Sequence, residues 1–314
     1  MSFKRLGCFA IGDRVSFGDL LSVNGGTYNV RRLTIDPFTK LQPTEHIIQV
    51  EKLLCPIERT PIIILVGLNY QSHVNETKLN VPKYPPIFVK PADALAGPFY
   101  TMAFTPTRGT ICKELLEEDA LDYVLGYTAG NYLSARNFQL PEASRTQFGY
   151  SKSFDQFGTI GYTITTASEI PDAEDPLLVA RVNGAVKQQT STIDMIWSVR
   201  QIISHLSWGM TLGTGTIITA GTPARVGFIT KEFLKAGDVV EVDIEGVASV
   251  KNGTRYTWYS RDSRCTLLDK KIYFWLLDAA YKEENIMSKS NPLLRFGALN
   301  GLKDIHNQRP SVCL

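Results

Sequence analysis

Three polar side chains in the middle of the chain are of the types that hold a small anionic carbonyl compound. Arg136, Gln139 and Lys152 lie within residues 121–161. They offer a bidentate cation, an amide and a point-charge ammonium, and such a set suits carboxylate and carbonyl oxygens. The sequence therefore predicts an anion-binding site in this region.

A candidate general base lies nearer the N-terminus. His73 and Glu76 are three positions apart, so they face the same side if residues 71–77 form a helical turn. An imidazole can take a proton near neutral pH, and a carboxylate partner raises its basicity and fixes its tautomer. The alternative is an incidental pair on a surface turn without a catalytic role.

A third candidate is the turn Gly221-Thr222-Pro223, which follows a predicted strand at residues 216–219. Hydroxyl and backbone N–H groups at a strand end can cradle a carboxylate, although an ordinary β-turn has the same composition. The sequence has no G-x-G-x-x-G that opens a helix, no Walker loop and no G-x-S-x-G. Nucleotide cofactors and a hydrolase nucleophile elbow are therefore not indicated.

The elements around these residues are mostly short strands. Residues 1–56 alternate apolar and polar side chains between Gly- and Asn-containing turns, which predicts a small N-terminal β-rich domain. Residues 61–70 form a short run rich in β-branched side chains, typical of a strand buried on both faces. Residues 87–90 also read as a strand, and Asn183-Gly184 is a strong hairpin signal.

Two segments have a helical pattern. Residues 114–124 combine a helical period with helix-forming residues, followed by a β-like segment at 125–128 and a polar turn at Gly130-Asn131. Residues 191–206 form an amphipathic pattern, with Ser191 or Thr192 as N-cap. Many strands and few helices predict a β-dominated α+β fold with a β-roll core.

The predicted organisation is an N-terminal domain over residues 1–56, a core over 57–253 and a C-terminal appendage over 254–314. The appendage has an aromatic cluster, a helix candidate at 270–282 and otherwise loosely patterned polar sequence, so we expect it to be partly disordered.

Composition excludes several classes of partner. The net charge is +2 without a Lys/Arg stripe, so no nucleic-acid partner is expected. No apolar run is long enough to span a bilayer, so no membrane partner is expected either. The five cysteines are scattered and odd in number, and the N-terminus lacks a signal pattern. Reduced thiols and a cytoplasmic location follow as predictions.

Taken together, these pieces resemble the fumarylacetoacetate hydrolase family. The resemblance is collinear from residue 62 to about 252. Its motifs are VGLNYQSHVNE, PPIFVKP, EDALDYVLGYTAGN, SAR followed by Gln139, SKSFDQF, VNG followed by Gln188, TIDMI and TAGTPARVG. It implies a β-roll core, a homodimer, a bound Mg²⁺ or Mn²⁺, and a 2-oxo or 1,3-dicarbonyl acid as substrate. The implied reactions are carbon–carbon bond hydrolysis, decarboxylation or keto–enol isomerisation.

The resemblance also implies roles for single residues. His73 with Glu76 would be the general-base pair, and Lys152 would stabilise the developing enolate or oxyanion. The residues that would hold the oxygens of the substrate are Arg136, Gln139, Tyr162 and Thr222.

The chain departs from the family at the metal site. Tyr132 occupies the position of a metal-binding Asp, and the Glu-x-Glu strand is missing where FTPTRGTIC passes directly to KELLEEDALDYV. Hard divalent cations need several oxygen ligands, and a protonated phenol is a poor one. Glu114, Glu117 and Glu118 either replace these ligands or form the solvated face of the predicted helix. The skipped strand predicts a gap in the roll.

Three explanations of this departure remain open. The protein is a metal-independent isomerase, dehydratase or cyclase; or a non-catalytic ligand-binding or partner protein; or the product of a faulty gene model, with coding sequence skipped near Ile111 and non-coding sequence read after Gly253. Our prediction is an enzyme of this family that acts on a small carbonyl acid with weakened or no metal dependence.

Overall fold

The computed structural model describes residues 3–12, 14–34, 41–57, 59–96, 102–106, 113–170, 175–254 and 312–313. The C-terminal appendage, including the helix predicted at 270–282, lies outside the described residues except for Thr254 and the last short strand.

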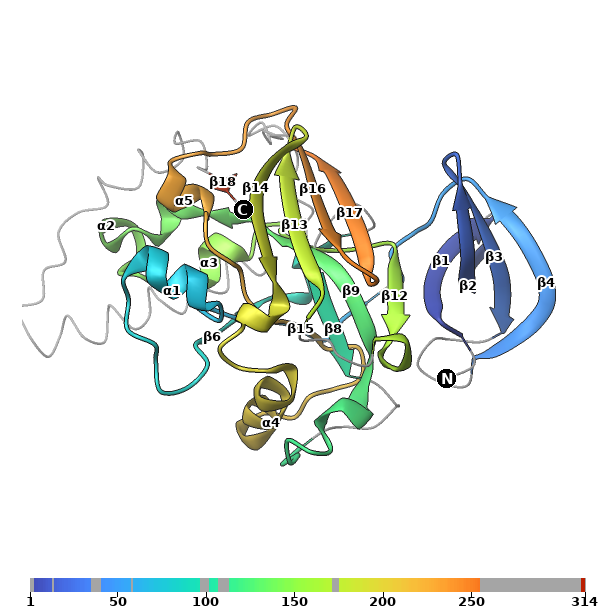
Figure 1. Ribbon diagram of the computed structural model, residues 1–314, viewed down its shortest axis with the longest axis horizontal. Coiled ribbons are helices and arrows are strands. Elements are labelled where there is room, and N and C mark those ends of the chain that lie inside the picture. The colour runs from blue at the N-terminus through green and yellow to red at the C-terminus, as the bar shows by residue number, and fades with distance from the viewer. Residues whose placement is uncertain are drawn as a thin grey trace, which may run out of the picture. The chain divides into compact units, whose positions relative to one another are not determined.

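Strands dominate the described part of the chain (Figure 1). A twelve-stranded sheet runs in the order β4-β3-β2-β1-β12-β9-β8-β15-β5-β6, and β11 and β7 branch from β9. Its strands are β1 (Arg5–Ile11), β2 (Arg14–Asn24), β3 (Thr27–Thr34), β4 (Gln42–Val50), β5 (Ile63–Val66), β6 (Ile87–Lys90), β7 (Leu95–Ala96), β8 (Met102–Pro106), β9 (Val124–Tyr132), β11 (Gly158–Ile160), β12 (Thr163–Thr166) and β15 (Ile217–Thr219).

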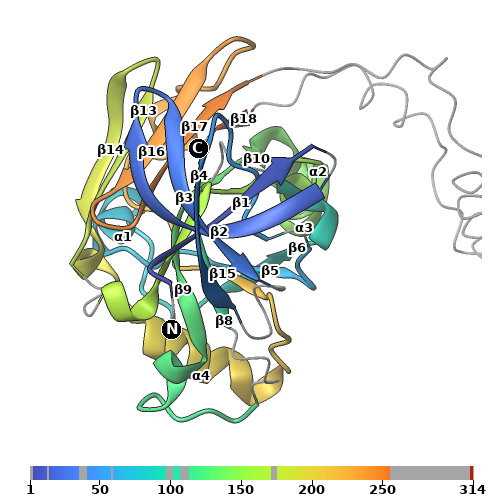
Figure 2. The same ribbon diagram turned by 90° about the vertical axis from the view of Figure 1, so that its right-hand side faces the viewer.

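Two smaller sheets accompany it. Figure 2 shows the four-stranded sheet as neighbouring yellow-green and orange hairpins. Its strands are β13 (Leu177–Val182), β14 (Ala185–Ser191), β16 (Val239–Ile244) and β17 (Ala248–Gly253), and the third sheet pairs β10 (Ser134–Ala135) with β18 (Val312–Cys313). The β13–β14 turn at Asn183-Gly184 has positive φ at both residues, so the hairpin prediction is confirmed.

The helices are short. The α-helices are α1 (Gln71–Thr77), α2 (Pro141–Ser144), α3 (Gly149–Lys152), α4 (Val199–Gly209) and α5 (Gly227–Thr230). The 3₁₀ helices are η1 (Ala92–Ala94), η2 (Ala120–Tyr123), η3 (Arg136–Gln139), η4 (Ala167–Glu169) and η5 (Thr192–Asp194). The β-dominated α+β prediction is confirmed, and the helical turn predicted at residues 71–77 is α1.

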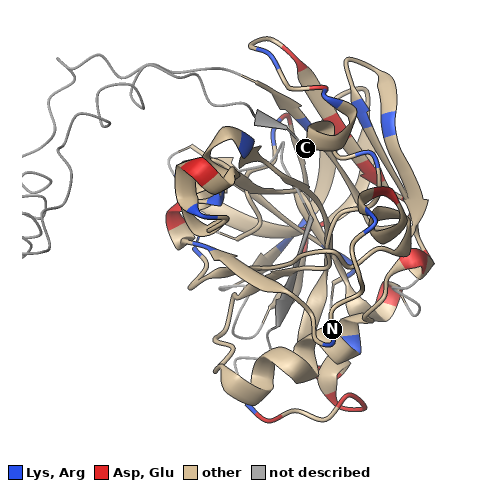
Figure 3. Cartoon of the chain, turned by 90° about the vertical axis from the view of Figure 1, so that its left-hand side faces the viewer, with Lys and Arg blue, Asp and Glu red and all other residues tan. Residues whose placement is uncertain are grey.

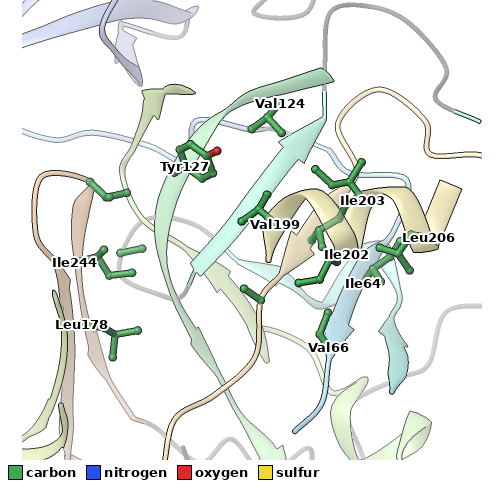
Figure 4. Close-up of a cluster of buried hydrophobic side chains, with 14 of the residues drawn as sticks. Ile64, Val66, Val124, Tyr127, Leu178, Val199, Ile202, Ile203, Leu206 and Ile244 are labelled. Atoms are coloured by element: carbon green, nitrogen blue, oxygen red, sulfur yellow. The ribbon is translucent and has the colours of Figure 1, made fainter. Parts of the chain in front are cut away.

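The core lies on both faces of β5. Ile64 and Val66 point into a cluster that also contains side chains of β9, β16 and α4 (Figure 4). Ile63 and Leu65 point the other way, into a second cluster with Ile160 and other strand residues. Successive side chains of a strand alternate between faces, and all four of these residues are at most 2% exposed. The strand predicted to be buried on both faces is therefore confirmed.

Helix α4 covers the first of these clusters with Val199, Ile202, Ile203 and Leu206. Each such buried side chain contributes about 1.5–3 kcal/mol relative to exposure. The helix begins with a capping box between Ser198 and Gln201. The predicted start of this helix at Ser191 or Thr192 is wrong, because α4 begins after Ser198. Ser191 instead ends β14 and caps the short η5, where its hydroxyl accepts from the Ile193 N–H.

The helix predicted over residues 114–124 is also wrong. Residues 113–116 are irregular, residues 117–119 form a turn, and only the short η2 precedes β9. The Ser207 hydroxyl accepts from the Leu115 N–H at 3.0 Å, and the Ser204 hydroxyl donates to the Leu115 carbonyl at 2.8 Å. These bonds to α4 replace intrahelical ones, so tertiary contacts override the local propensity.

The turn predicted at Gly130-Asn131 is instead continuous strand, because these residues pair with Ile160 and Thr159 of β11. The gap predicted for the skipped strand is absent between β9 and β15, since β8 pairs with both of them. The sheet is therefore continuously paired from β9 through β8 to β15 among the described residues.

Strands β1–β4 join the large sheet through β1, which pairs with β12. Lys/Arg and Asp/Glu residues are interspersed over the elements drawn in Figure 3, in keeping with the balanced composition. Of the helices in the described residues, none is long and apolar enough to cross a membrane.

Candidate active site

Helix α1 brings His73 and Glu76 together. Nδ1 of His73 lies 3.2 Å from Oε2 of Glu76, and the two side chains are 14% and 16% exposed. Burial lowers the pKa of His73 from its ordinary 6.5. The hydrogen bond and charge of Glu76 raise this pKa in part, and the charge of Arg136 lowers it further. The pair thus holds a neutral imidazole at neutral pH, as a general base requires.

A distant carboxylate fixes the start of this helix. The N-cap residue of α1 is Tyr70, and its side chain makes no capping hydrogen bond. Instead Oδ2 of Asp194, in η5, accepts from the Ser72 backbone N–H at 3.0 Å and from the Ser72 hydroxyl at 2.5 Å. A negative charge near the first turn stabilises a helix, so Asp194 holds α1 where His73 needs it.

Asn69, which is fully buried, ties the residues before the helix to two other loops. Its Nδ2 donates to the carbonyls of Ala220 at 2.6 Å and Trp197 at 3.1 Å. Its Oδ1 accepts from the Trp197 N–H at 2.8 Å. A buried amide with this many partners fixes the local backbone strongly.

The loop after β15 closes on Glu76 from the other side. The N–H of Arg225 donates to Oε1 of Glu76 at 2.7 Å, and Arg225 has φ of +68°. A Cβ on Gly221 would lie 2.8 Å from Cβ of Asn69, so only glycine fits there. Backbone held in sparsely populated conformations is typical of functional sites.

Gln188 holds the middle of the same loop. Its Nε2 donates to the carbonyls of Pro223 at 3.1 Å and Ala224 at 2.9 Å, and lies 3.5 Å from the Thr222 hydroxyl. Thr222 therefore lies in the loop that contacts the dyad, where the sequence placed a possible carboxylate cradle.

Lys152 ends α3 and is 7% exposed. Its ammonium donates to the Ser134 hydroxyl at 2.8 Å and lies 4.5 Å from the ring centroid of Phe88. An aromatic face attracts a cation, so the Phe88 ring offsets part of the cost of removing this ammonium from bulk water.

Arg136 connects Lys152 with the dyad. Its Nη1 donates to Oε1 of Gln139 at 3.0 Å, and Nε2 of Gln139 donates to the Ser151 hydroxyl at 2.7 Å. The same guanidinium is close enough to His73 to act on its pKa. The structure therefore brings these predicted residues into one region.

Tyr162 is placed differently. Its hydroxyl lies 3.3 Å from Oγ of Ser249, and its ring centroid is 5.7 Å from that of Tyr28. Among the described residues, no contact shown for Tyr162 joins it to the dyad or to Lys152. Its substrate-binding role stays a prediction that rests on the resemblance alone.

The residues around Tyr132 do not fit a hard divalent cation. Burial raises the pKa of Tyr132 well above its ordinary value, and the charge of Tyr70 raises it further. Since Tyr70 is itself a neutral phenol near neutral pH, burial is what keeps Tyr132 protonated there. Mg²⁺ and Mn²⁺ need anionic or carbonyl oxygens instead. In the described part of the chain, no three His, Cys, Asp or Glu side chains gather as ligands.

The glutamates considered as replacement ligands lie elsewhere. Glu114, Glu117 and Glu118 are exposed. The guanidinium of Arg200, in α4, donates to the backbone carbonyls of Glu117 and Glu118 at 3.2 and 2.9 Å. They form a solvated surface, as one of the two interpretations held, although on a turn rather than on a helix.

The sequence did not identify three residues that support this region: Asp194, Gln188 and Lys90. All three fall inside the family motifs, but their partners are backbone groups far away in the chain. The signal for Lys90 was a lysine at the end of the otherwise apolar strand IFVK, since lysine is rarely buried without a reason.

The family model for the fumarylacetoacetate (FAA) hydrolase C-terminal domain matches residues 62–255, more than half of the chain. The chain belongs to the fumarylacetoacetate hydrolase family. The motifs quoted above lie within the matched range, so the resemblance read from them is confirmed.

Individual proteins with fumarylacetoacetate hydrolase or isomerase names are also similar to this chain in sequence and structure. A fumarylacetoacetate hydrolase domain-containing protein 2 homolog of Dictyostelium discoideum is 36% identical over 65% of this chain and 74% of its own. The structure of 2-hydroxyhepta-2,4-diene-1,7-dioate isomerase from Mycobacterium marinum is 32% identical, with a TM-score of 0.67 over 80% of this chain and 97% of that one. Fumarylacetoacetate hydrolase from Exiguobacterium antarcticum is 27% identical, with a TM-score of 0.68 over 81% of this chain and all of that one.

Proposed function

We propose that the protein is an enzyme that moves a proton next to a carbonyl group in a small 2-oxo or 1,3-dicarbonyl acid. The observation that carries the proposal is the His73–Glu76 pair, held at 3.2 Å with its helix fixed from outside. Isomerases and hydrolases are both found among the similar structures. Enolisation or water activation by one base is a step that both reaction classes share.

Each residue has a role in this step. Glu76 accepts from Nδ1 of His73 and leaves Nε2 as the atom that takes the proton, from carbon or from water. Arg136 and Gln139 orient the substrate carboxylate, and the Lys152 ammonium stabilises the negative charge that develops on the enolate oxygen. Thr222 offers a hydroxyl to the substrate from the loop that contacts Glu76.

In this proposal metal dependence is weak or absent. The support is the donor set: a protonated, half-buried phenol stands at the position where the family carries an aspartate. The positive charge for enolate stabilisation then comes from Lys152 and Arg136.

The test is turnover of a panel of 2-oxo and 1,3-dicarbonyl acids by the full chain, with Mg²⁺ or Mn²⁺ and with excess EDTA. We expect turnover of at least one compound that persists within about threefold in EDTA. Turnover abolished by EDTA and restored by Mg²⁺ would contradict metal independence. No turnover of any compound, together with unchanged oxalate binding by the His73→Ala variant in calorimetry, would favour a non-catalytic ligand-binding protein.

A further inference from the structure

Lys90, the last residue of β6, is buried completely. Its Nζ donates to the Leu133 carbonyl at 3.1 Å and, over a short distance, to the Lys152 carbonyl. The stem is closely packed as well, because a Cβ on Gly158 would lie only 3.2 Å from Cδ of Lys90. Burying a lysine end to end is costly, so its position requires an explanation.

The two hydrogen-bond partners of Lys90 lie beside the contact between Lys152 and Ser134. One is the backbone carbonyl of Lys152 itself, and the other is the carbonyl of Leu133. Leu133 directly precedes Ser134, whose hydroxyl accepts from the Lys152 ammonium at 2.8 Å. Lys90 thus connects the backbone of Lys152 with the backbone of Leu133. The Lys152 side chain connects the same two segments a second time, through the Ser134 hydroxyl.

Both acceptors of Lys90 are neutral carbonyls, and a neutral amine has two N–H groups to give them. Burial first, and the positive charge of Lys152 second, lower the pKa of Lys90 to about 6. Among the described titratable groups, Lys152 is the one whose charge acts on Lys90. The Phe157 ring, 5.6 Å from Nζ, offsets only part of the cost of a charge.

We propose that Lys90 is a positioning residue for Lys152: its two hydrogen bonds hold the backbone of Leu133 and Lys152 so that the Lys152 ammonium points at the developing enolate. Lys90 has this role as an uncharged amine. Its effect on turnover rests on the proposed function, while its effect on Lys152 does not. A charged Lys90 would place a second cation beside Lys152 and favour loss of the proton that Lys152 needs.

The first test replaces the amine with an uncharged chain of similar length, Lys90→Met, and uses the exposed Lys83→Met as the matched control. We expect kcat to fall roughly 10- to 100-fold with KM within about twofold, because a misplaced catalytic group costs about this much. Lys83→Met should match the wild type. A folded Lys90→Met variant with wild-type kcat would overturn the proposal.

The second test needs no turnover. The protein is labelled with ¹³C,¹⁵N-lysine, the Nζ signals are assigned with Lys90→Met and Lys152→Met, and wild type is titrated by NMR. We expect an uncharged Lys90 at about pH 8, protonation near pH 6, and a response of the Lys152 signal at that same point. A charged Lys90 at about pH 8 would overturn the proposal. A Lys152 Nζ signal that does not change when Lys90 is protonated would overturn it as well.

These tests separate the two proposals. If wild type turns over none of the dicarbonyl acids, the proposed function fails, and the titration still decides the role of Lys90. If Lys90→Met does not fold, Lys152→Met still assigns the Lys152 signal, and a Lys152 signal without a response near pH 6 overturns the proposal.

Discussion

The base end of the site, residues 69–76, and the amine end, made of Lys90, Lys152 and Arg136, are supported by different kinds of group. At the base end, carboxylates and an amide hold the backbone: Asp194 fixes the start of α1, and Glu76 accepts from His73 and from the Arg225 N–H. At the amine end, the three basic side chains lie near aromatic rings and donate to hydroxyl, amide and carbonyl oxygens.

The candidate base and the candidate oxyanion-stabilising ammonium therefore have separate structural supports. Residues 188–197 and 220–225 hold the base end in place. The amine end is held by β6, β10 and α3. Tyr132 directly precedes Leu133 in the chain and interacts with Tyr70. With this phenol in place, His73 still contacts Glu76 and the Lys152 ammonium still contacts Ser134.

The largest expected effect is the loss of the base itself. His73→Ala should lower kcat by roughly 10²- to 10⁴-fold, because general base catalysis contributes that much. Steady-state kinetics with the best substrate of the panel measures the loss, and circular dichroism checks the fold. His205→Ala, which removes a histidine stacked on Tyr84 outside the site, is the control and should keep wild-type activity. Equal losses in both variants would show that fold, not chemistry, was changed.

The base end could be predicted from the sequence because its signal is local. The spacing of His73 and Glu76 on one helical turn predicts their contact, and the structure shows it. The central strand of the core could also be predicted, since the continuous apolar run within residues 61–70 is typical of a strand buried on both faces, and the structure shows one.

The residues that support the site, such as Asp194 and Lys90, could not be predicted from the sequence in the same way. Asp194 contacts Ser72 across more than a hundred residues, and Lys90 contacts backbone carbonyls, which no side-chain pattern reveals. The helix predicted at residues 114–124 failed for a related reason, because two serines of α4 bond the Leu115 backbone and replace its helical partners. Contacts between distant segments decide these cases, and local propensity does not.

Removing the ammonium should have the next largest effect. Lys152→Met should lower kcat by roughly 10²- to 10³-fold, the usual cost of one donor to a developing oxyanion. Because the base end is supported separately, the acid limb of its pH–rate profile should stay where the wild type has it. A shifted limb would show that the two ends are coupled and would break the comparison.

Weakening the support of the base should matter less than removing the base. Asp194→Asn keeps an acceptor but loses the charge that faces Ser72, so we expect kcat to fall about tenfold, or about 1.4 kcal/mol. Asp175→Asn is the matched control, because Asp175 accepts from the exposed Ser191 hydroxyl away from the dyad. An Asp194→Asn variant with unchanged kcat would show that α1 holds His73 without this carboxylate.

The smallest expected effect is a shift of the acid limb, and its direction follows from the groups around His73. The imidazole must be neutral to take a proton, so activity is full above its pKa and is lost as the pH falls through it. Burial and Arg136 lower this pKa below 6.5, and Glu76 raises it. The wild-type limb should therefore lie below pH 6.5, and Glu76→Gln should move it further down by removing the carboxylate. The limb is read from kcat/KM against pH, in buffers of constant ionic strength. Movement toward higher pH in Glu76→Gln would mean that a group other than His73 sets the limb, and the base would then have to be sought at the amine end.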